Sequence, residues 1–560
     1  MLMTNKNILV AACFAVLVSG CNDNNNQQQN DQENQQPTTA TFSPVEGTIS
    51  QLHAALAANT TSCEAVVQSY LDRIAAYDDV GPELHAVIST NPNALAEARA
   101  LDERYAETGE MNSLHCVTVL VKDNFDTNDM ATTAGGLAMQ FNLPPDNAFT
   151  IGRMKQRGAI ILGKANLDEF AFGYEGSSSI EGQTKNAYDL ERGPGGSSSG
   201  TGAAIAASFA MVGTGTDTGG SIRIPSSVEG LVGIRPSLRL VSQDGIVPLS
   251  HSQDTGGPMC RTVEDCAHLL DAMVGFDSSA HSGQRENFAY DAPLISSPFL
   301  YQIITGVPHS YTQYLDEGAL NGARIGVVRE MFGDGSEQQN QVVQATIEAA
   351  LAQMQAAGAV VEEVTIPKLS EIFERYKSVS RYEFCNDLTD YLGSWSELAD
   401  GHHLSFAALA ASFDYEVRHQ QYFYYYGLFC GDQSANEDYQ LNQTERPTQV
   451  RNALMQALNN VDDAGIPQGQ AYDVLLYPTM LGLASELGQA PLAGDNNRLS
   501  PFSGFPALTM PAGMTNSEPQ LPVGMEMLAR EFDEASLIKI AYAYEKMAQP
   551  RQAPSHTPAL

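Results

Sequence analysis

The part of the sequence that most restricts the fold is residues 193–225, which read GPGGSSSGTGAAIAASFAMVGTGTDTGGSIRIP. A glycine- and serine-dense loop, residues 193–200, precedes an apolar, alanine-rich run, residues 203–212, and a second glycine-rich turn, residues 213–221. Glycine allows two backbones to approach closely, and an alanine-rich apolar run favours a buried helix. A flexible linker carries no such apolar run, so the stretch predicts two turns held around a buried helix.

A serine near the end of this stretch is a candidate nucleophile. Ser221 follows two glycines, so bare backbone N–H groups lie beside its hydroxyl, as an oxyanion hole requires. A nucleophilic serine also needs a base within hydrogen-bond distance. The candidate base is Lys122, which follows the β-branched run HCVTVLV (residues 115–121), a predicted buried strand. Burial lowers the pKa of a lysine and leaves a neutral amine that accepts a proton, whereas the alternative is an ordinary surface lysine.

Three blocks of the sequence resemble the amidase signature family of serine hydrolases: KDN at residues 122–124, GGSS at residues 195–198 and GTDTGGSIR at residues 215–223. GKANLDEF at residues 163–170 and SGFPA at residues 503–507 are similar to further blocks of that family, and the matches extend over about residues 49–550. The resemblance implies an α/β amidase-signature fold with a large mixed β-sheet. Alternating strand and helix patterns to about residue 275 independently favour an α/β sheet covered by helices on both faces.

The resemblance also implies a role for each matched residue. Ser221 would be the nucleophile, Ser197 a bridging serine in a cis peptide, and Lys122 the base. Together with the N–H of Ser221, the oxyanion hole would use the backbone N–H groups of Thr218, Gly219 and Gly220. The resemblance implies no metal and no cofactor.

One position departs from the usual pattern of the family. Ser199 replaces a glycine, so that GGSSGG becomes GGSSSG, which is similar to the bacterial peptide amidase branch. The implied reaction is hydrolysis of the carboxamide C–N bond of a small molecule or peptide through an acyl-enzyme, with C-terminal peptide amides as one candidate substrate. The alternatives are an esterase with the same triad and a non-catalytic, amidotransferase-like binding protein.

The N-terminal residues predict export. Residues 1–20 combine Lys6 with a short apolar core and end in LVSG before Cys21, which is typical of a lipoprotein signal peptide with Cys21 as the lipidated residue. The alternative is an ordinary secretory signal with a chance cysteine. Residues 21–41 are polar and predict a disordered tether, and residues 42–560 form the predicted catalytic domain. We therefore expect a cell-envelope lipoprotein, in the outer membrane by preference, that contacts membrane only through its lipid anchor.

Charge and cysteine content limit the partners and the redox compartment. The net charge of −36 predicts repulsion of nucleic acid and anionic lipid. Six cysteines remain after the lipobox, and an exported chain permits disulfides between them. Chain proximity suggests the pairs Cys63–Cys116 and Cys385–Cys430, while Cys260 and Cys266 are equally compatible with buried thiols. The sequence does not determine the oligomeric state.

Three other motifs compete with this interpretation. Residues 196–200 match the G-x-S-x-G elbow with Ser198 at its centre, but the preceding residues do not predict the strand that an elbow requires. Residues 158–164 match most of a P-loop, yet Ala165 replaces the required Ser or Thr. The pair His402 and His403 lacks a partner at metal-ligand spacing and predicts a solvated surface.

The remaining elements are predicted from periodicity and composition. Helices are expected within residues 66–74, 94–105, 342–357 and 536–546, and strands within residues 323–328, 360–366 and 474–478. Residues 277–322 are expected to wrap the surface. The helical, tyrosine-rich residues 372–429 are expected to form part of the cover over the substrate.

Overall fold

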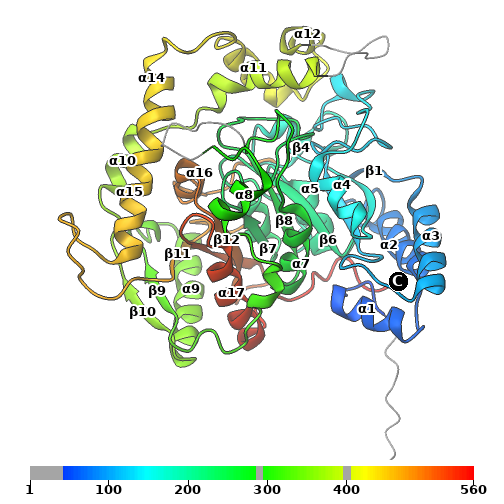
Figure 1. Cartoon of the computed structure of the whole chain (residues 1–560), viewed down its shortest axis with the longest axis horizontal. Helices are drawn as coiled ribbons and strands as arrows, with labels where there is room; N and C mark the ends of the chain where they lie inside the picture. Colours follow the sequence, from blue (N-terminus) through cyan, green and yellow to red (C-terminus); the bar gives the residue numbers. More distant parts are fainter. Residues whose placement is uncertain (1–41, 285–293, 395–404) are drawn as a thin grey trace, which may run out of the picture. The chain divides into compact units, whose positions relative to one another are not determined.

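The structure, a computed structural model, describes residues 42–284, 294–394 and 405–560 (Figure 1). The predicted signal peptide, Cys21 and the tether lie outside the described residues, as do His402 and His403. No helix in the described ranges is both long and apolar enough to span a membrane.

An 11-stranded mixed sheet forms the centre of the fold. The strands run in the order β1-β3-β2-β6-β8-β7-β12-β13-β11-β9-β10, and β4 pairs with β5 in a separate hairpin. Parallel pairing joins β2 to β3 and β6, and β9 to β10 and β11, whereas the central strands pair antiparallel. The strands are β1 Val87–Thr90, β2 Thr118–Lys122, β3 Ile160–Ala165, β4 Ser177–Ser178, β5 Gly182–Gln183, β6 Val212–Asp217, β7 Val232–Arg235, β8 Thr255–Cys260, β9 Arg324–Val327, β10 Val360–Glu363, β11 Val474–Pro478, β12 Ala507–Met514 and β13 Pro522–Leu528.

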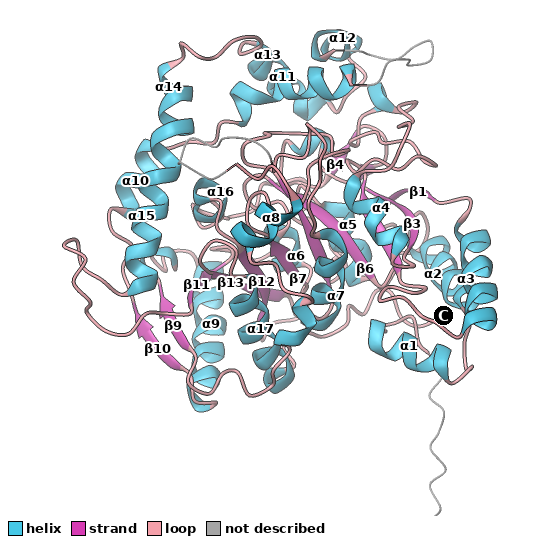
Figure 2. Cartoon of the chain, viewed as in Figure 1, coloured by secondary structure: helices cyan, strands magenta, loops and turns pink. Residues whose placement is uncertain are grey.

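Helices cover both faces of the sheet. Every residue of β2, β3, β6 and β8 is buried. Successive side chains of a strand point to opposite faces, so complete burial requires cover on both sides. Figure 2 shows helices packed on the central strands, among them α5 on β2 and β6, and α7 on β8. The predicted α/β class and mixed sheet are therefore confirmed.

Most of the helical segments predicted from the sequence lie within helices of the structure. The observed helices differ from the predictions mainly in where they begin and end. They are α1 Ile49–Ala57, α2 Cys63–Tyr77, α3 Ala94–Thr108, α4 Phe149–Gln156, α5 Ser199–Ala206, α6 Arg223–Val228, α7 Val263–Met273, α8 Pro298–Thr305, α9 Gln338–Ala356, α10 Leu369–Arg375, α11 Ser380–Gly393, α12 Phe406–Ser412, α13 Gln420–Gly427, α14 Glu437–Gln440, α15 Arg446–Asn459, α16 Leu499–Ser503 and α17 Glu534–Ala548.

The central stretch corrects one prediction. The helix expected over residues 203–212 is α5, which begins at Ser199 and ends at Ala206, and the expected turn from residue 213 is mostly the buried strand β6. Glycine serves packing here rather than turning, because a Cβ at Gly213 would lie 2.6 Å from Thr201 Cγ2. Small residues let α5 lie directly on the strand.

Two of the three competing motifs lie within the described residues, and neither has a matching structural context. No strand lies between residues 184 and 198 in the described chain, so the alternative of a nucleophile elbow around Ser198 is excluded, as the sequence analysis expects. Most of the P-loop match is strand β3, and its Lys164 lies in a buried ion pair, with Nζ 3.0 Å from Asp123 Oδ1.

A separate layer of helices, α11 to α13, lies at the top of the view in Figure 2. It packs through aromatic side chains on Phe172, whose ring centroid lies 4.7 Å from that of Phe384 and 5.3 Å from that of Tyr426. Edge-to-face aromatic pairs of this kind stabilise a buried contact beyond their apolar area. The tyrosine-rich segment therefore covers the loops that follow β3.

Three disulfides join the six cysteines of the folded region. The suggested pairs Cys63–Cys116 and Cys385–Cys430 are both present, with Cα atoms 5.2 Å apart in each. Cys260 and Cys266 are also paired, with Cα atoms 5.5 Å apart, so they are not free thiols.

Candidate active site

Lys122 is the last residue of β2 and is fully buried. Its Nζ lies 2.8 Å from Ser197 Oγ, although 75 residues separate the two along the chain. Burial lowers the pKa of Lys122 from 10.5 to about 7, against the opposing fields of Asp168, Asp254 and Asp217. At neutral pH a large fraction of this side chain is therefore an uncharged amine, which has a lone pair to accept a proton.

Thr216, on β6, fixes the direction of that lone pair. Its Oγ1 lies 2.8 Å from Lys122 Nζ and also accepts a hydrogen bond from Asn124 Nδ2 at 3.0 Å. Its carbonyl oxygen lies 3.5 Å from the same Nζ. A neutral amine has two N–H groups and one lone pair, so donation of both N–H groups toward Thr216 leaves the lone pair for the hydroxyl of Ser197.

Ser197 and Ser221 lie on loops that meet in front of the sheet. The Gly196–Ser197 peptide bond is cis, as the family resemblance implies. The next residue ties the two loops together, because the Ser198 N–H donates to the carbonyl oxygen of Ser221 at 3.2 Å. Ser221 lines a cavity, whereas Ser197 and Lys122 are fully buried and are not among the lining residues.

The predicted oxyanion donors lie on the turn between β6 and α6. Thr218 and Gly219 line the same cavity as Ser221, and the carbonyl oxygens of both are held by side chains, the Thr218 oxygen by Gln253 Nε2 at 3.3 Å and the Gly219 oxygen by Tyr174 Oη at 3.0 Å. These bonds fix the peptide planes of the turn. The Gly220 N–H donates to Asp217 Oδ1 at 2.8 Å, so this predicted donor already has an acceptor.

A buried ion-pair network supports the turn from behind. Arg223 lies between two carboxylates, with Nε 3.0 Å from Asp217 Oδ2 and Nη1 2.6 Å from Glu526 Oε1. Burial alone would raise the pKa of Asp217, yet Arg223 and Arg235 hold it at about 2. Asp217 is thus ionised, and its two oxygens accept the N–H groups of Gly220 and Ile222.

The cavity in front of Ser221 has a volume of about 440 Å³ and is lined by loops and by residues of the helical layer. Apolar side chains from Phe172 and Phe502 and polar groups from Tyr174 and Asn497 meet there. A hollow of this size, mostly apolar with a few polar groups, is typical of a small-molecule site. The tyrosine-rich segment contributes Tyr426, as its predicted covering position implies.

Among the described residues, three groups of His, Cys and acidic side chains bring ligand atoms within 4.8 Å of one another. One group, Asp168, Glu175 and His419, adjoins the site, since the Asp168 N–H donates to the Ser197 carbonyl oxygen at 3.1 Å. Asp168 Oδ1 already accepts the N–H groups of Glu175 and Gly176, at 2.9 and 2.8 Å. This carboxylate therefore holds the loop beside Ser197.

The sequence alone does not identify the groups that support these residues. Asp217 and Arg223 stand in a recognisable motif, but nothing local indicates their pairing. Glu526 comes 303 residues after Arg223 and carries no sequence signal of its own. Thr216 stands in the same block, and its hydroxyl acquires a function only because β6 lies beside β2.

Comparison with known proteins finds one matching family, and related sequences and solved structures that cover most of this chain. The family described as Amidase matches residues 65–538. The A subunit of glutamyl-tRNA(Gln) amidotransferase from Thermoanaerobacter pseudethanolicus is 32% identical over 515 residues, covering 89% of this chain and 96% of the relative, and that from Ralstonia pickettii is 34% identical over 520 residues, covering 89% and 97%. The solved structure of native peptide amidase from Stenotrophomonas maltophilia has a TM-score of 0.75 and 33% identity, covering 91% of this chain and 99% of that one.

Proposed function

The chain belongs to the amidase family and is an amidase, and from this we propose that it hydrolyses carboxamide C–N bonds through a Ser221–Ser197–Lys122 triad. The observation that carries the proposal is the buried amine of Lys122, 2.8 Å from Ser197 Oγ, beside a cavity that Ser221 lines. A lysine whose pKa is lowered to about 7 is suited to general base catalysis at neutral pH.

In the proposed mechanism, Ser221 Oγ attacks the carbonyl carbon of the substrate. Ser197 takes the proton of Ser221 and passes its own proton to Lys122 Nζ. The negative charge that forms on the carbonyl oxygen is stabilised by the backbone N–H groups of Thr218, Gly219 and Ser221, since that of Gly220 donates to Asp217, and each such donor is worth about 10²–10³ in rate. The ammonium returns its proton through Ser197 to the departing nitrogen, and water then releases the acyl group by the same steps.

The test is covalent labelling with a fluorophosphonate, joined to an assay of released ammonia. We expect the wild-type protein to be labelled and Ser221→Ala to be unlabelled and inactive. Ser517→Ala, at an exposed position, is the matched control and should behave as wild type. Labelling of Ser221→Ala at the wild-type level would contradict the assignment of the nucleophile.

The proposed substrates are peptide amides, since a peptide amidase from Stenotrophomonas maltophilia is 33% identical over nearly all of this chain. A screen of peptide, aryl and fatty amides for released ammonia tests this. An esterase with the same triad is distinguished by matched amide and ester substrates: turnover of the ester alone would favour it.

The relatives from glutamyl-tRNA(Gln) amidotransferase favour a second candidate, a subunit that releases ammonia for a partner. The same triad would serve that reaction. An activity assay of the purified protein separates the two candidates. An amidase hydrolyses amides in the absence of any partner protein, whereas the activity of an amidotransferase subunit depends on its partner. We favour the free-standing amidase because the N-terminal sequence predicts export, away from tRNA.

We also propose that the protein is an exported lipoprotein of the cell envelope, attached through Cys21. The support is the lipobox-like LVSGC at residues 17–21 and the polar residues after it.

A further inference from the structure

The cavity in front of Ser221 is lined by basic side chains and by no acidic ones among the described residues. Lys377 and Arg498 line it, on the side formed by the helical layer and by the loop before α16. A second hollow of about 480 Å³ shares four lining residues with it, including Lys377 and Tyr426, and adds Arg381. The two hollows therefore form a continuous surface that leads away from Ser221.

This basic surface is unexpected on a chain with 66 acidic and 30 basic residues. A third cavity, of about 490 Å³, reflects the overall composition, with six aspartates in its lining: Asp126, Asp146, Asp244, Asp254, Asp387 and Asp390. Acidic side chains thus line this third cavity and are absent from the lining of the cavity at Ser221 and of the hollow that shares residues with it. The sign of the local charge selects among substrates, because a basic lining attracts anions and a carboxylate there would repel them.

Lys377 differs from the other basic lining residues in its partners. Its Nζ donates to the Phe373 carbonyl oxygen at 2.8 Å, and no ion pair joins it to a carboxylate of the described residues. Arg498 pairs with Asp495 at 2.8 Å, and Arg381 lies 3.8 Å from Asp438. An ammonium has three donors, so Lys377 keeps two for a ligand.

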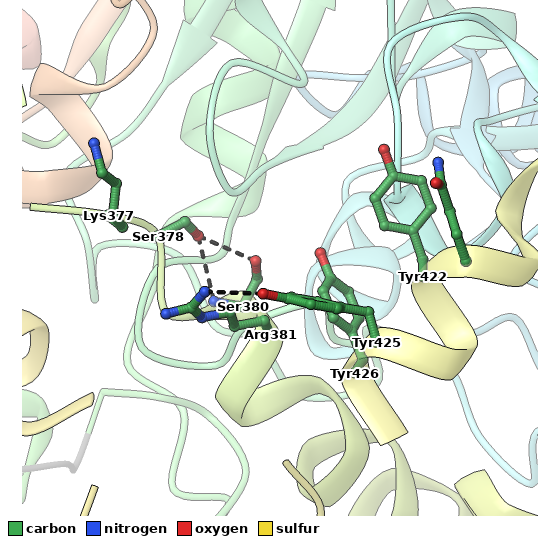
Figure 3. Close-up of a pocket in the computed structure, with 8 residues that line it drawn as sticks. Lys377, Ser378, Ser380, Arg381, Tyr422, Tyr425 and Tyr426 are labelled. Atoms are coloured by element: carbon green, nitrogen blue, oxygen red, sulfur yellow. Dashed lines mark hydrogen bonds between the residues drawn. The ribbon is translucent and has the colours of Figure 1, made fainter. Parts of the chain in front are cut away.

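Tyrosines extend the binding surface beyond Lys377. Figure 3 shows Tyr422, Tyr425 and Tyr426 projecting from α13, with Tyr425 and Tyr426 nearer to Arg381 than Tyr422 is. The Nη1 of Arg381 donates to the Tyr425 hydroxyl at 3.4 Å. These rings offer apolar faces and hydroxyl donors to the part of a substrate remote from Ser221.

We propose that this enzyme prefers amides that carry a carboxylate a short distance from the scissile carboxamide, with that carboxylate bound by Lys377 while the carboxamide carbon lies at Ser221. The inference rests on the proposed amidase function and deepens it by naming the substrate class.

The experiment compares two isosteric substrates, N-acetyl-glutamyl-leucinamide and N-acetyl-glutaminyl-leucinamide. We expect kcat/KM to be about fivefold higher for the glutamyl amide, which is the effect of one partly exposed ion pair. The ratio should shrink at high salt. Lys377→Gln should bring the ratio close to one, and Lys377→Arg should restore it. Lys539→Gln, which removes the same charge from an exposed position on α17, should leave the ratio at the wild-type value.

The outcomes separate this inference from the proposed function. Equal kcat/KM values for the two amides would overturn the inference and leave the amidase proposal standing. If neither amide is hydrolysed, calorimetric binding of both to Ser221→Ala decides: tighter binding of the glutamyl amide that is lost in Ser221→Ala/Lys377→Gln supports the inference, and equal or undetectable binding overturns it.

Discussion

Replacing Lys122 with Met is expected to abolish amide hydrolysis and, at the same time, to stabilise the folded protein at low pH. Burial lowers the pKa of Lys122 from 10.5 to about 7, and a shift of that size corresponds to about 5 kcal/mol against the buried ammonium. The folded protein binds fewer protons than the unfolded chain between these two values, so its free energy of unfolding rises with pH across that window. Below about pH 7 the full cost of the buried charge is present.

Methionine has a similar length and carries no charge, so Lys122→Met removes this cost. It also removes a hydrogen-bond partner from Ser197, which we expect to cost about 2 kcal/mol, while Thr216 keeps its bond from Asn124. The net gain near pH 6 is then about 3 kcal/mol, or roughly 3 °C in Tm for a folded region of this size. Near pH 10.5 the cost of the buried charge has almost disappeared, so the lost hydrogen bond leaves the variant about 2 kcal/mol less stable than the wild type.

The assay is thermal unfolding of the wild type and Lys122→Met at about pH 6 and pH 10, with amidase activity measured in parallel. We expect a loss of activity of about 10²–10⁴, the usual contribution of a general base. Lys539→Met, at an exposed position on α17, is the control and should show no pH-dependent difference. A Lys122→Met variant that is destabilised equally at both pH values would refute the lowered pKa and the argument built on it.

Four further results are expected. The kcat/KM for a neutral amide should fall about tenfold per pH unit below about pH 7, as Lys122 becomes protonated; a pH–rate profile measures this. Thr216→Val should lower kcat by about tenfold or more with little change in KM, since the amine loses its orienting acceptor. Arg223→Met should cost about 3–5 kcal/mol in denaturant unfolding, because the buried Glu526 loses its ion-pair partner and Asp217 keeps only Arg235. Cys21→Ser should abolish incorporation of labelled palmitate and release the protein from the membrane fraction.

The elements with strong periodicity could be predicted from the sequence. The helical patterns at residues 94–105 and 536–546 fall within α3 and α17, and the β-branched run before Lys122 contains most of β2. In the two helices the side-chain spacing carries this information, whereas β2 is buried on both faces and is recognised by its continuous apolar run. The alanine- and glycine-rich run at residues 203–217 leads to a wrong prediction, since small apolar residues suit a buried helix and a tightly packed strand equally.

The candidate site likewise contains residues that the sequence predicts and residues that it does not. The motifs around Lys122, Ser197 and Ser221 could be located because short blocks in a fixed order survive as sequence patterns. The groups that support these three residues could not be located from the sequence. Glu526 reaches Arg223 from β13, and Thr216 reaches Lys122 only through the parallel pairing of β2 with β6.

The sequence by itself determined the family, the fold class and the residues proposed for catalysis, since each depends on residue identity over short stretches. Only the tertiary structure decided that Lys122 is desolvated and that an acid-rich chain lines the cavity at Ser221 with basic side chains. Both properties depend on distance and burial, because an electrostatic interaction depends on the position of a charge in space and not on its position in the sequence.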